Sequence, residues 1–217
     1  MFDNICLDHR HAPFNHAYLR NLLRVIDHAL QEHASITVVR VDLHLPEYAD
    51  TGDSITCDPN LNPGLISRFI ASLNAKIDAR RKSTQKRGKR TYHTDLTYLW
   101  CRETGDNQPE WGVRKSHYHL ALFVNTDAWH SLGSYGEKGT GLASLIQAAW
   151  LSALRMSEYT ECRSLIHFPE HPLHYLDSQK ADFKQQYDHL TFRLSYFAKE
   201  RSKSYSREER SFGCSQR

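Results

Sequence analysis

The stretch His117-Tyr-His-Leu-Ala-Leu-Phe-Val-Asn125 predicts a β-strand and is the centre of the expected fold. Side chains alternate along a strand, so His117 and His119 point to one face, roughly 6.5 Å apart along the strand. The residues expected on the other face are suited to a core: Tyr118, Leu120, Leu122 and Val124. A rigid apolar backing of this kind favours a paired metal-ligand site. The spacing alone is equally compatible with two surface histidines on an open sheet face.

Two further stretches predict strands beside this one. Residues 95–103, Asp-Leu-Thr-Tyr-Leu-Trp-Cys-Arg-Glu, precede a strong turn signal, Thr104-Gly-Asp-Asn-Gln-Pro109, which predicts an antiparallel hairpin with 117–125. Residues 36–45 are β-branched and end before Pro46. Alternation gives this third strand an apolar face and a polar face, and the polar face is a candidate site wall formed by Arg40, Asp42 and His44.

The remaining pattern predicts helices around these strands. Apolar residues at helical spacing predict helices at 17–32, 63–81, 142–153 and 179–203, and 164–168 predicts a short strand. A polar loop is expected at 46–62 and a Gly-rich linker at 133–141. This order predicts an α+β fold in which helices flank one face of a central antiparallel β-sheet. Residues 1–217 are expected to form a single domain, with an N-terminal helical segment at 1–35 and a basic, flexible tail at 204–217.

Composition excludes several classes of protein. Hydrophobic residues make up 40% of the 217 residues and charged residues 24%, which is typical of a soluble globular protein. The five cysteines are scattered and form no Cys-x-x-Cys pair, which argues against a disulfide framework or a cysteine zinc site. There is no apolar run long enough for a transmembrane helix and no secretory signal pattern at the N-terminus. We therefore expect a cytoplasmic protein with no membrane partner.

The net charge is only +3, but residues 80–90 contain seven cations and no anion. Clustered cations release counterions when they bind nucleic acid, which favours a phosphate-contacting arm over a solvated basic loop. The cations expected to contact DNA here are Arg80, Arg81, Lys82, Lys86 and Arg87.

Two histidines leave a metal ion under-coordinated, and a carboxylate from the neighbouring strand is the natural third ligand. If the hairpin forms, Glu103 lies at its end near His117, whereas Glu110 lies in the turn and is the alternative. Mixed histidine and carboxylate ligands suit Mn²⁺ or Mg²⁺ bound to phosphate oxygens. Zinc would more often be accompanied by thiols or a third histidine.

A second candidate group lies in Arg193-Leu-Ser-Tyr-Phe-Ala-Lys199. On the expected helix, Tyr196 and Lys199 share a face, and Lys203 extends that face towards DNA. A tyrosine oxygen becomes a good nucleophile only when its proton leaves or a cation stabilises the phenolate, and a lysine one turn away supplies such a cation. The alternative is a packed tyrosine beside a surface lysine.

Together these residues resemble the signature of HUH endonucleases, in which His-hydrophobic-His is followed by Tyr-x-x-Lys. More closely, the chain resembles the YagK/YfjJ C-terminal-domain family, which is found in filamentous phages and prophages and is presumed to replicate DNA. Six short stretches carry this resemblance in order along the chain: residues 39–44, 99–103, 117–125, 149–154, 194–199 and 210–215.

The resemblance implies a replication-initiator-like fold with the histidine pair on the open face of the sheet. It also implies that His117 and His119 bind the metal, that Tyr196 is the nucleophile and that Lys199 is the lysine of the tyrosine motif. The matching Trp-Cys-Arg-Glu favours Glu103 as the acidic ligand, although Glu103 precedes His117 by fourteen positions, where a gap of about eight to nine residues would be comfortable.

The expected function is nicking and rejoining of single-stranded or locally melted origin DNA through a 5′-phosphotyrosine bond, as in rolling-circle replication. The chain contains no Walker-type motif, so unwinding would come from another protein, and a host helicase and polymerase are the expected partners. Two alternatives are a non-catalytic DNA-binding regulator and a metallohydrolase with a water nucleophile.

Overall fold

A computed structural model describes residues 5–46, 58–104, 116–136, 138–201 and 210–216. The strands in it are β1 (Ser35–His44), β2 (Thr97–Thr104), β3 (Ser116–Asn125), β4 (Ile166–His167), β5 (Leu173–Asp177) and β6 (Phe212–Cys214). The helices are α1 (His16–Glu32), α2 (Leu65–Lys86), α3 (Leu142–Ala153) and α4 (Phe183–Leu194), and the 3₁₀ turns are η1 (His9–His11), η2 (Thr160–Leu165) and η3 (Ser195–Ala198). This is the α+β fold that the sequence predicts.

The strands form one six-stranded sheet in the order β4-β1-β3-β2-β6, and β5 also pairs with β1. All pairs are antiparallel, and the predicted hairpin of β2 and β3 is present. The register places Glu103 opposite His117 and Asp42 opposite His119. Three neighbouring strands therefore bring the candidate residues to one end of the sheet.

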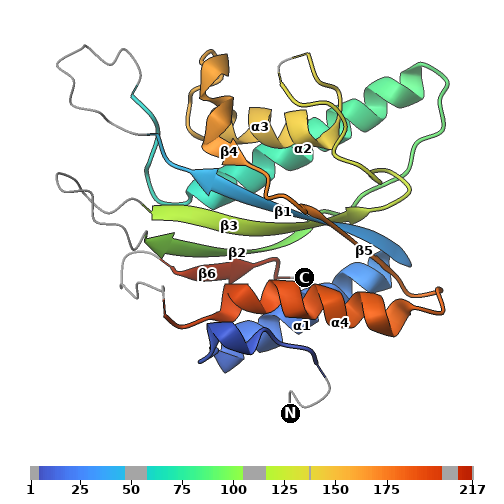
Figure 1. Ribbon diagram of the computed structural model, residues 1–217. Coiled ribbons are helices and arrows are strands. Elements are labelled where there is room, and N and C mark those ends of the chain that lie inside the picture. The colour runs from blue at the N-terminus through green and yellow to red at the C-terminus, as the bar shows by residue number, and fades with distance from the viewer. Residues whose placement is uncertain (1–4, 47–57, 105–115, 137, 202–209, 217) are drawn as a thin grey trace.

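Helices cover both faces of the sheet, and the expectation of helices on one face was wrong (Figure 1). One core lies between the sheet and α2 with α3, and a second lies between the sheet and α1 with α4. Strand β1 shows that both faces are covered. Ile36 and Val38 point to one face and Val39 points to the other, yet all three are fully buried. A continuous apolar run is typical of a strand that is buried on both sides.

The α1 and α4 face of the sheet changes character along its length. Val38, Leu99 and Phe123 pack into the second core at one end of this face. Towards the other end, the residues on the same face become polar, with Asp42 on β1 and His119 on β3. This face is thus half core and half candidate site, and the apolar half fixes the position of the polar half.

Several boundaries differ from the predicted ones. Helix α2 continues through most of the basic stretch to Lys86, and α4 ends at Leu194 and is followed by the 3₁₀ turn η3. Strand β4 has only two residues and is preceded by the 3₁₀ turn η2. The short strands β5 and β6 were not predicted. Within the tail predicted at 204–217, Phe212–Cys214 is ordered as β6 and pairs with β2, so this part is not flexible. No helix in the described part of the chain is both long and apolar enough to cross a membrane.

Candidate metal and tyrosine site

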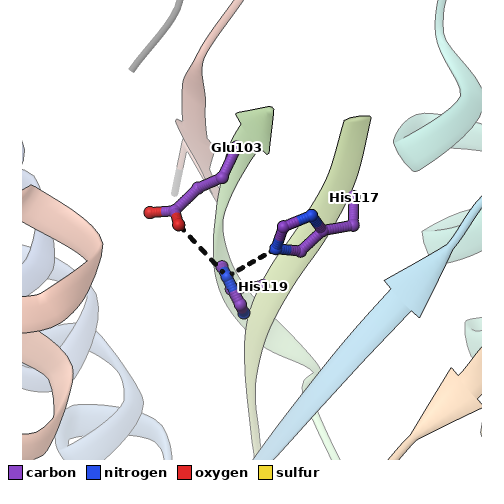
Figure 2. A group of neighbouring side chains, drawn as sticks. All are labelled: Glu103, His117 and His119. Atoms are coloured by element: carbon purple, nitrogen blue, oxygen red, sulfur yellow. Dashed lines mark hydrogen bonds and ion pairs between the residues drawn. The ribbon is translucent and has the colours of Figure 1, made fainter. Parts of the chain in front are cut away.

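Glu103, His117 and His119 form a compact group whose ligand atoms all lie within 4.8 Å of one another (Figure 2). His119 Nε2 lies 3.0 Å from His117 Nε2 and 3.4 Å from Glu103 Oε2. Two ligand atoms bound about 2.1 Å from one ion at tetrahedral or octahedral angles lie roughly 3.0–3.4 Å apart. The observed separations therefore suit a single small divalent cation, and the group could bind one.

Burial and neighbouring charges prepare the two histidines differently. Burial and the neighbouring His119 and His44 rings lower the pKa of His117, which favours the neutral form that binds metal. Burial also opposes the charged form of His119, but hydrogen bonds to Asp42 and Glu103 outweigh it and raise the pKa of His119. Two carboxylates thus lie on opposite sides of one imidazole.

Asp42 is bonded to the imidazole of His119, with 2.6 Å between Asp42 Oδ1 and His119 Nδ1. Burial works against the Asp42 carboxylate, yet the hydrogen bond and charge of His119 hold the pKa of Asp42 below its ordinary value. An ionised Asp42 accepts the Nδ1 proton, so Nε2 is the nitrogen of His119 that faces Glu103 and His117, and this nitrogen binds a metal ion once it is unprotonated. Such a carboxylate behind a histidine orients metal ligands in many proteins. Asp42 was also predicted to contact DNA; in the described part of the chain its hydrogen-bond partners are His119 and His167.

Tyr196 lies beside the same group. Its hydroxyl donates a hydrogen bond to Glu103 Oε2 at 3.0 Å, and its ring lies edge-to-face with that of His119, with 5.2 Å between centroids. Burial, followed by the charge of Glu103 and the hydrogen bond to it, raises the pKa of Tyr196 well above its ordinary value. In this arrangement the phenol is protonated and held by the carboxylate.

The side chain of Lys199 also lies beside Tyr196. Its Nζ lies 3.0 Å from Glu103 Oε2 and 3.6 Å from the centroid of the Tyr196 ring. The predicted helix does not extend to Lys199, which has an extended backbone after η3. The two side chains nevertheless meet at Glu103, so the predicted pair is brought together by a different backbone.

The N-terminal segment holds η3 over the end of the sheet. Asn15 N donates to the carbonyl of Ala198 at 2.7 Å, and Glu200 N donates to the carbonyl of Pro13 at 3.0 Å. Asp8 N donates to Ser195 Oγ at 3.0 Å. These bonds flank Tyr196 on both sides and fix the backbone that carries it.

Other polar residues surround this group. Arg40 lies with its guanidinium carbon 5.9 Å from the centroid of the Tyr196 ring, and exposed His44 stacks on His117 with 5.5 Å between centroids. His11 lies edge-to-face with Tyr196 at 4.9 Å, and His167 Nδ1 lies 3.5 Å from Asp42 Oδ2. Neither His11 nor His167 was predicted, because only the fold brings these distant segments together.

The basic stretch lies elsewhere. Arg80 and Arg81 line a cavity with Asp127 and Trp129, residues that follow the end of β3 opposite to His117. Lys82 and Lys86 are exposed on α2, and Arg87 is the residue that ends this helix. Lys203 and the alternative ligand Glu110 lie outside the described residues.

The fold and the site together define an α+β domain in which a buried Glu/His/His group, able to bind a metal ion, lies beside a half-buried tyrosine. The chain belongs to the family described as the YagK/YfjJ C-terminal domain, whose model matches residues 3–215.

Two relatives from Escherichia coli strain K12 are similar along most of their length. The uncharacterized protein YagK is 39% identical over 199 residues, covering 92% of each chain. The uncharacterized protein YfjJ is 35% identical over 200 residues, covering 91% of this chain and 93% of its own. No solved structure matches the chain.

Proposed function

We propose that this protein is an HUH-type endonuclease that nicks and rejoins single-stranded DNA through a 5′-phosphotyrosine bond, with a divalent metal ion as cofactor. On this proposal it initiates rolling-circle-type replication of a phage, prophage or related mobile element. The observation that carries the proposal is the position of the Tyr196 hydroxyl, 3.0 Å from an oxygen of Glu103 within the candidate metal-ligand group. A nucleophile and a phosphate-binding cation would then act on the same phosphodiester.

The chain's own residues account for the covalent step. The Tyr196 oxygen attacks the phosphorus, a phosphotyrosine bond forms, and the bond from phosphorus to the 3′ oxygen breaks. The phenolic proton is released to solvent, since Glu103 would hold the metal ion, and the departing 3′ oxygen takes up a proton from solvent. Lys199 stabilises the phenolate that develops, because its ammonium lies against the tyrosine ring. The reverse attack by a 3′-hydroxyl reseals the strand.

Glu103, His117 and His119 would hold the metal ion, with Asp42 fixing the orientation of His119. A bound Mn²⁺ or Mg²⁺ supplies charge stabilisation to a non-bridging oxygen of the scissile phosphate. The carboxylate oxygen of Glu103 suits these two ions, and the group contains no thiolate of the kind that softer metals select.

The proposed substrate is single-stranded or locally melted origin DNA. Arg40, beside Tyr196, supplies a cation next to the scissile phosphate. The cations on α2, at the other end of β3, would contact the DNA farther away. A host helicase and a polymerase would open the duplex and extend the free 3′-hydroxyl.

The proposal is tested by incubating the protein with an origin-like single-stranded oligonucleotide and Mn²⁺, followed by a denaturing gel. A covalent adduct is expected, and Tyr196→Phe should abolish it. Tyr175→Phe is a matched control, because Tyr175 is an exposed tyrosine on β5 outside the site. An undiminished adduct with Tyr196→Phe excludes Tyr196 as the nucleophile.

The same experiment separates the two alternatives. A non-catalytic regulator would bind DNA without metal dependence and without an adduct. A metallohydrolase with a water nucleophile would cleave the DNA, leave no protein on the product and be insensitive to Tyr196→Phe. The hydrogen bond between Tyr196 and Glu103 supports the tyrosine over a water nucleophile.

A further inference from the structure

A second cavity, of about 620 Å³, lies on the opposite face of the sheet from the candidate metal site. Alternation along β2 explains its position, because Cys101 and Glu103 face the site while Tyr98 and Trp100 face the other way. Tyr118 of β3 completes the aromatic wall, and its neighbours in sequence are the two histidines of the site. The cavity is thus separated from the metal ligands by the thickness of the sheet. Its volume is typical of a small-molecule or nucleotide site.

The aromatic residues of this cavity are closely packed, but their rings are not fully covered. Gly213 of the edge strand β6 lies directly beneath Trp100, and a Cβ atom at this glycine would lie 2.6 Å from the indole Nε1. Trp100 and Tyr118 meet edge-to-face with 5.9 Å between centroids. Tyr98, Trp100 and Tyr118 are only partly buried, so part of each ring faces the cavity.

The cavity also carries positive charge. Arg102 is buried in its wall, and its charge, with that of Arg68, acts on the Tyr118 phenol. Arg210 is exposed at the cavity. None of the described residues that line it is acidic. Aromatic faces beside arginines are the usual means by which proteins hold single-stranded nucleic acid.

We propose that this cavity binds one nucleotide of the single-stranded DNA outside the cleaved phosphodiester, with its base stacked on the aromatic wall and its phosphate on Arg210. The inference rests on the proposed function in so far as the strand bound here is the substrate. The DNA then passes around the β6 edge of the sheet, because β6 is the last strand on that side. The nucleotide bound in this cavity would hold the flanking DNA in place while Tyr196 acts on the opposite face of the sheet.

The test measures DNA binding without cleavage. The full chain is titrated, in the presence of EDTA, into a fluorescein-labelled oligodeoxythymidylate of about 16 nucleotides, a length that fills a typical single-strand site. Loss of one stacking contact in Tyr98→Ala should weaken binding by roughly 5- to 150-fold. Tyr98→Phe keeps the ring and should bind like the unmodified protein, which separates stacking from folding. Tyr175→Ala removes an exposed tyrosine outside the cavity and should have no effect.

The charge contribution is measured through salt. Arg210→Gln should reduce the slope of log affinity against log salt by roughly 0.7, the value for one phosphate of a single strand. Lys180→Gln is the control, since Lys180 is exposed in the turn before α4 and lines neither described cavity. An unchanged slope with Arg210→Gln excludes Arg210 as the phosphate ligand.

Photocrosslinking locates the base directly. An oligonucleotide containing 5-iododeoxyuridine should crosslink to Tyr98, Trp100 or Tyr118, as identified by mass spectrometry. Crosslinks confined to the opposite face of the sheet, or wild-type affinity in Tyr98→Ala, would overturn the inference.

These outcomes are independent of the adduct assay. If Tyr98→Ala weakens binding but the unmodified protein forms no adduct with Mn²⁺, the cavity binds DNA and the proposed nicking activity is wrong. If the adduct forms and Tyr98→Ala binds normally, the nicking activity stands and the cavity is not a DNA site.

Discussion

Asp42→Asn is expected to weaken metal binding although Asp42 is not itself a ligand. The substitution keeps the size of the side chain and removes the negative charge behind His119. The amide can present either a donor or an acceptor to Nδ1, so it no longer fixes which nitrogen of His119 carries the proton. Only the fraction of molecules with the Nε2 lone pair towards Glu103 and His117 remains ready to bind.

The size of the effect follows from the geometry. The bond of 2.6 Å between Asp42 and His119 is short and involves a charged partner, a class that contributes about 1.5–3 kcal/mol. Loss of such a partner behind a metal ligand typically weakens metal affinity about 10- to 100-fold, which corresponds to ~1.4–2.8 kcal/mol. The two ranges agree, so we expect the Kd for Mn²⁺ to rise by roughly one to two orders of magnitude.

The assay is a titration of the protein with Mn²⁺, followed by the paramagnetic resonance signal of the free ion. His117→Ala removes a ligand and should bind more weakly than Asp42→Asn. His130→Ala is the control, because His130 is an exposed histidine outside the candidate ligand group. A Kd for Asp42→Asn within twofold of the unmodified protein would refute the role of Asp42 in orienting His119.

Three further predictions concern the nucleophile, the second core and the basic stretch. Lys199→Met should slow adduct formation in single-turnover assays by about 10²-fold, as expected when a preorganised charge beside the reacting oxygen is lost, and a rate within threefold of normal would contradict its role. Burial, followed by neighbouring cationic side chains, lowers the pKa of His174 to about 4 from 6.5, so the folded state favours its neutral form. The stability that depends on this neutral form is complete above pH 6.5 and falls by ~3 kcal/mol as the pH drops towards 4. In urea unfolding, the free energy of unfolding of His174→Gln should therefore depend less on pH in this range. Parallel pH profiles for the variant and the unmodified protein would rule out the contribution of His174. Replacing Arg80 and Arg81 together by glutamine should lower the salt dependence of single-strand binding by roughly 1.4 in slope without removing the adduct, whereas an unchanged slope would mean that neither arginine contacts phosphate.

Much of the fold could be predicted because local periodicity encodes it. The alternation in 117–125 and 36–45 gave β3 and β1 within a residue or two, and the turn signal at 104–109 gave the hairpin. Strands β5 and β6 could not be found in this way, since three to five residues contain too little pattern. Their existence depends on the free edges of β1 and β2, with which they pair.

The site was predictable where it depends on strand geometry and not where it depends on distant contacts. Register alone places Glu103 opposite His117, fourteen positions further along the chain, because the ladder between β2 and β3 also pairs Thr104 with Ser116. Helical spacing predicted that Tyr196 and Lys199 lie close together, and they do, but they are not on an α-helix. A 3₁₀ turn also brings positions three apart to the same side. The role of Asp42 needed the pairing of β1 with β3, which no local pattern specifies.

The two carboxylates around His119 have separate tasks, and this division links the candidate metal site to the tyrosine. Among the described residues, the hydrogen-bond partners of the Asp42 carboxylate are the histidines His119 and His167. Glu103 Oε2, in contrast, is shared by His119, Tyr196 and Lys199. Burial, followed by the negative charge of Glu103, raises the pKa of Tyr196 and so retains its proton. Any cation bound by Glu103 opposes this effect, because it draws the same charge away from the phenol. On the proposed function, the tyrosine is therefore least reactive when the ligand group holds no ion, and binding of a metal ion and activation of the nucleophile are coupled through one oxygen atom.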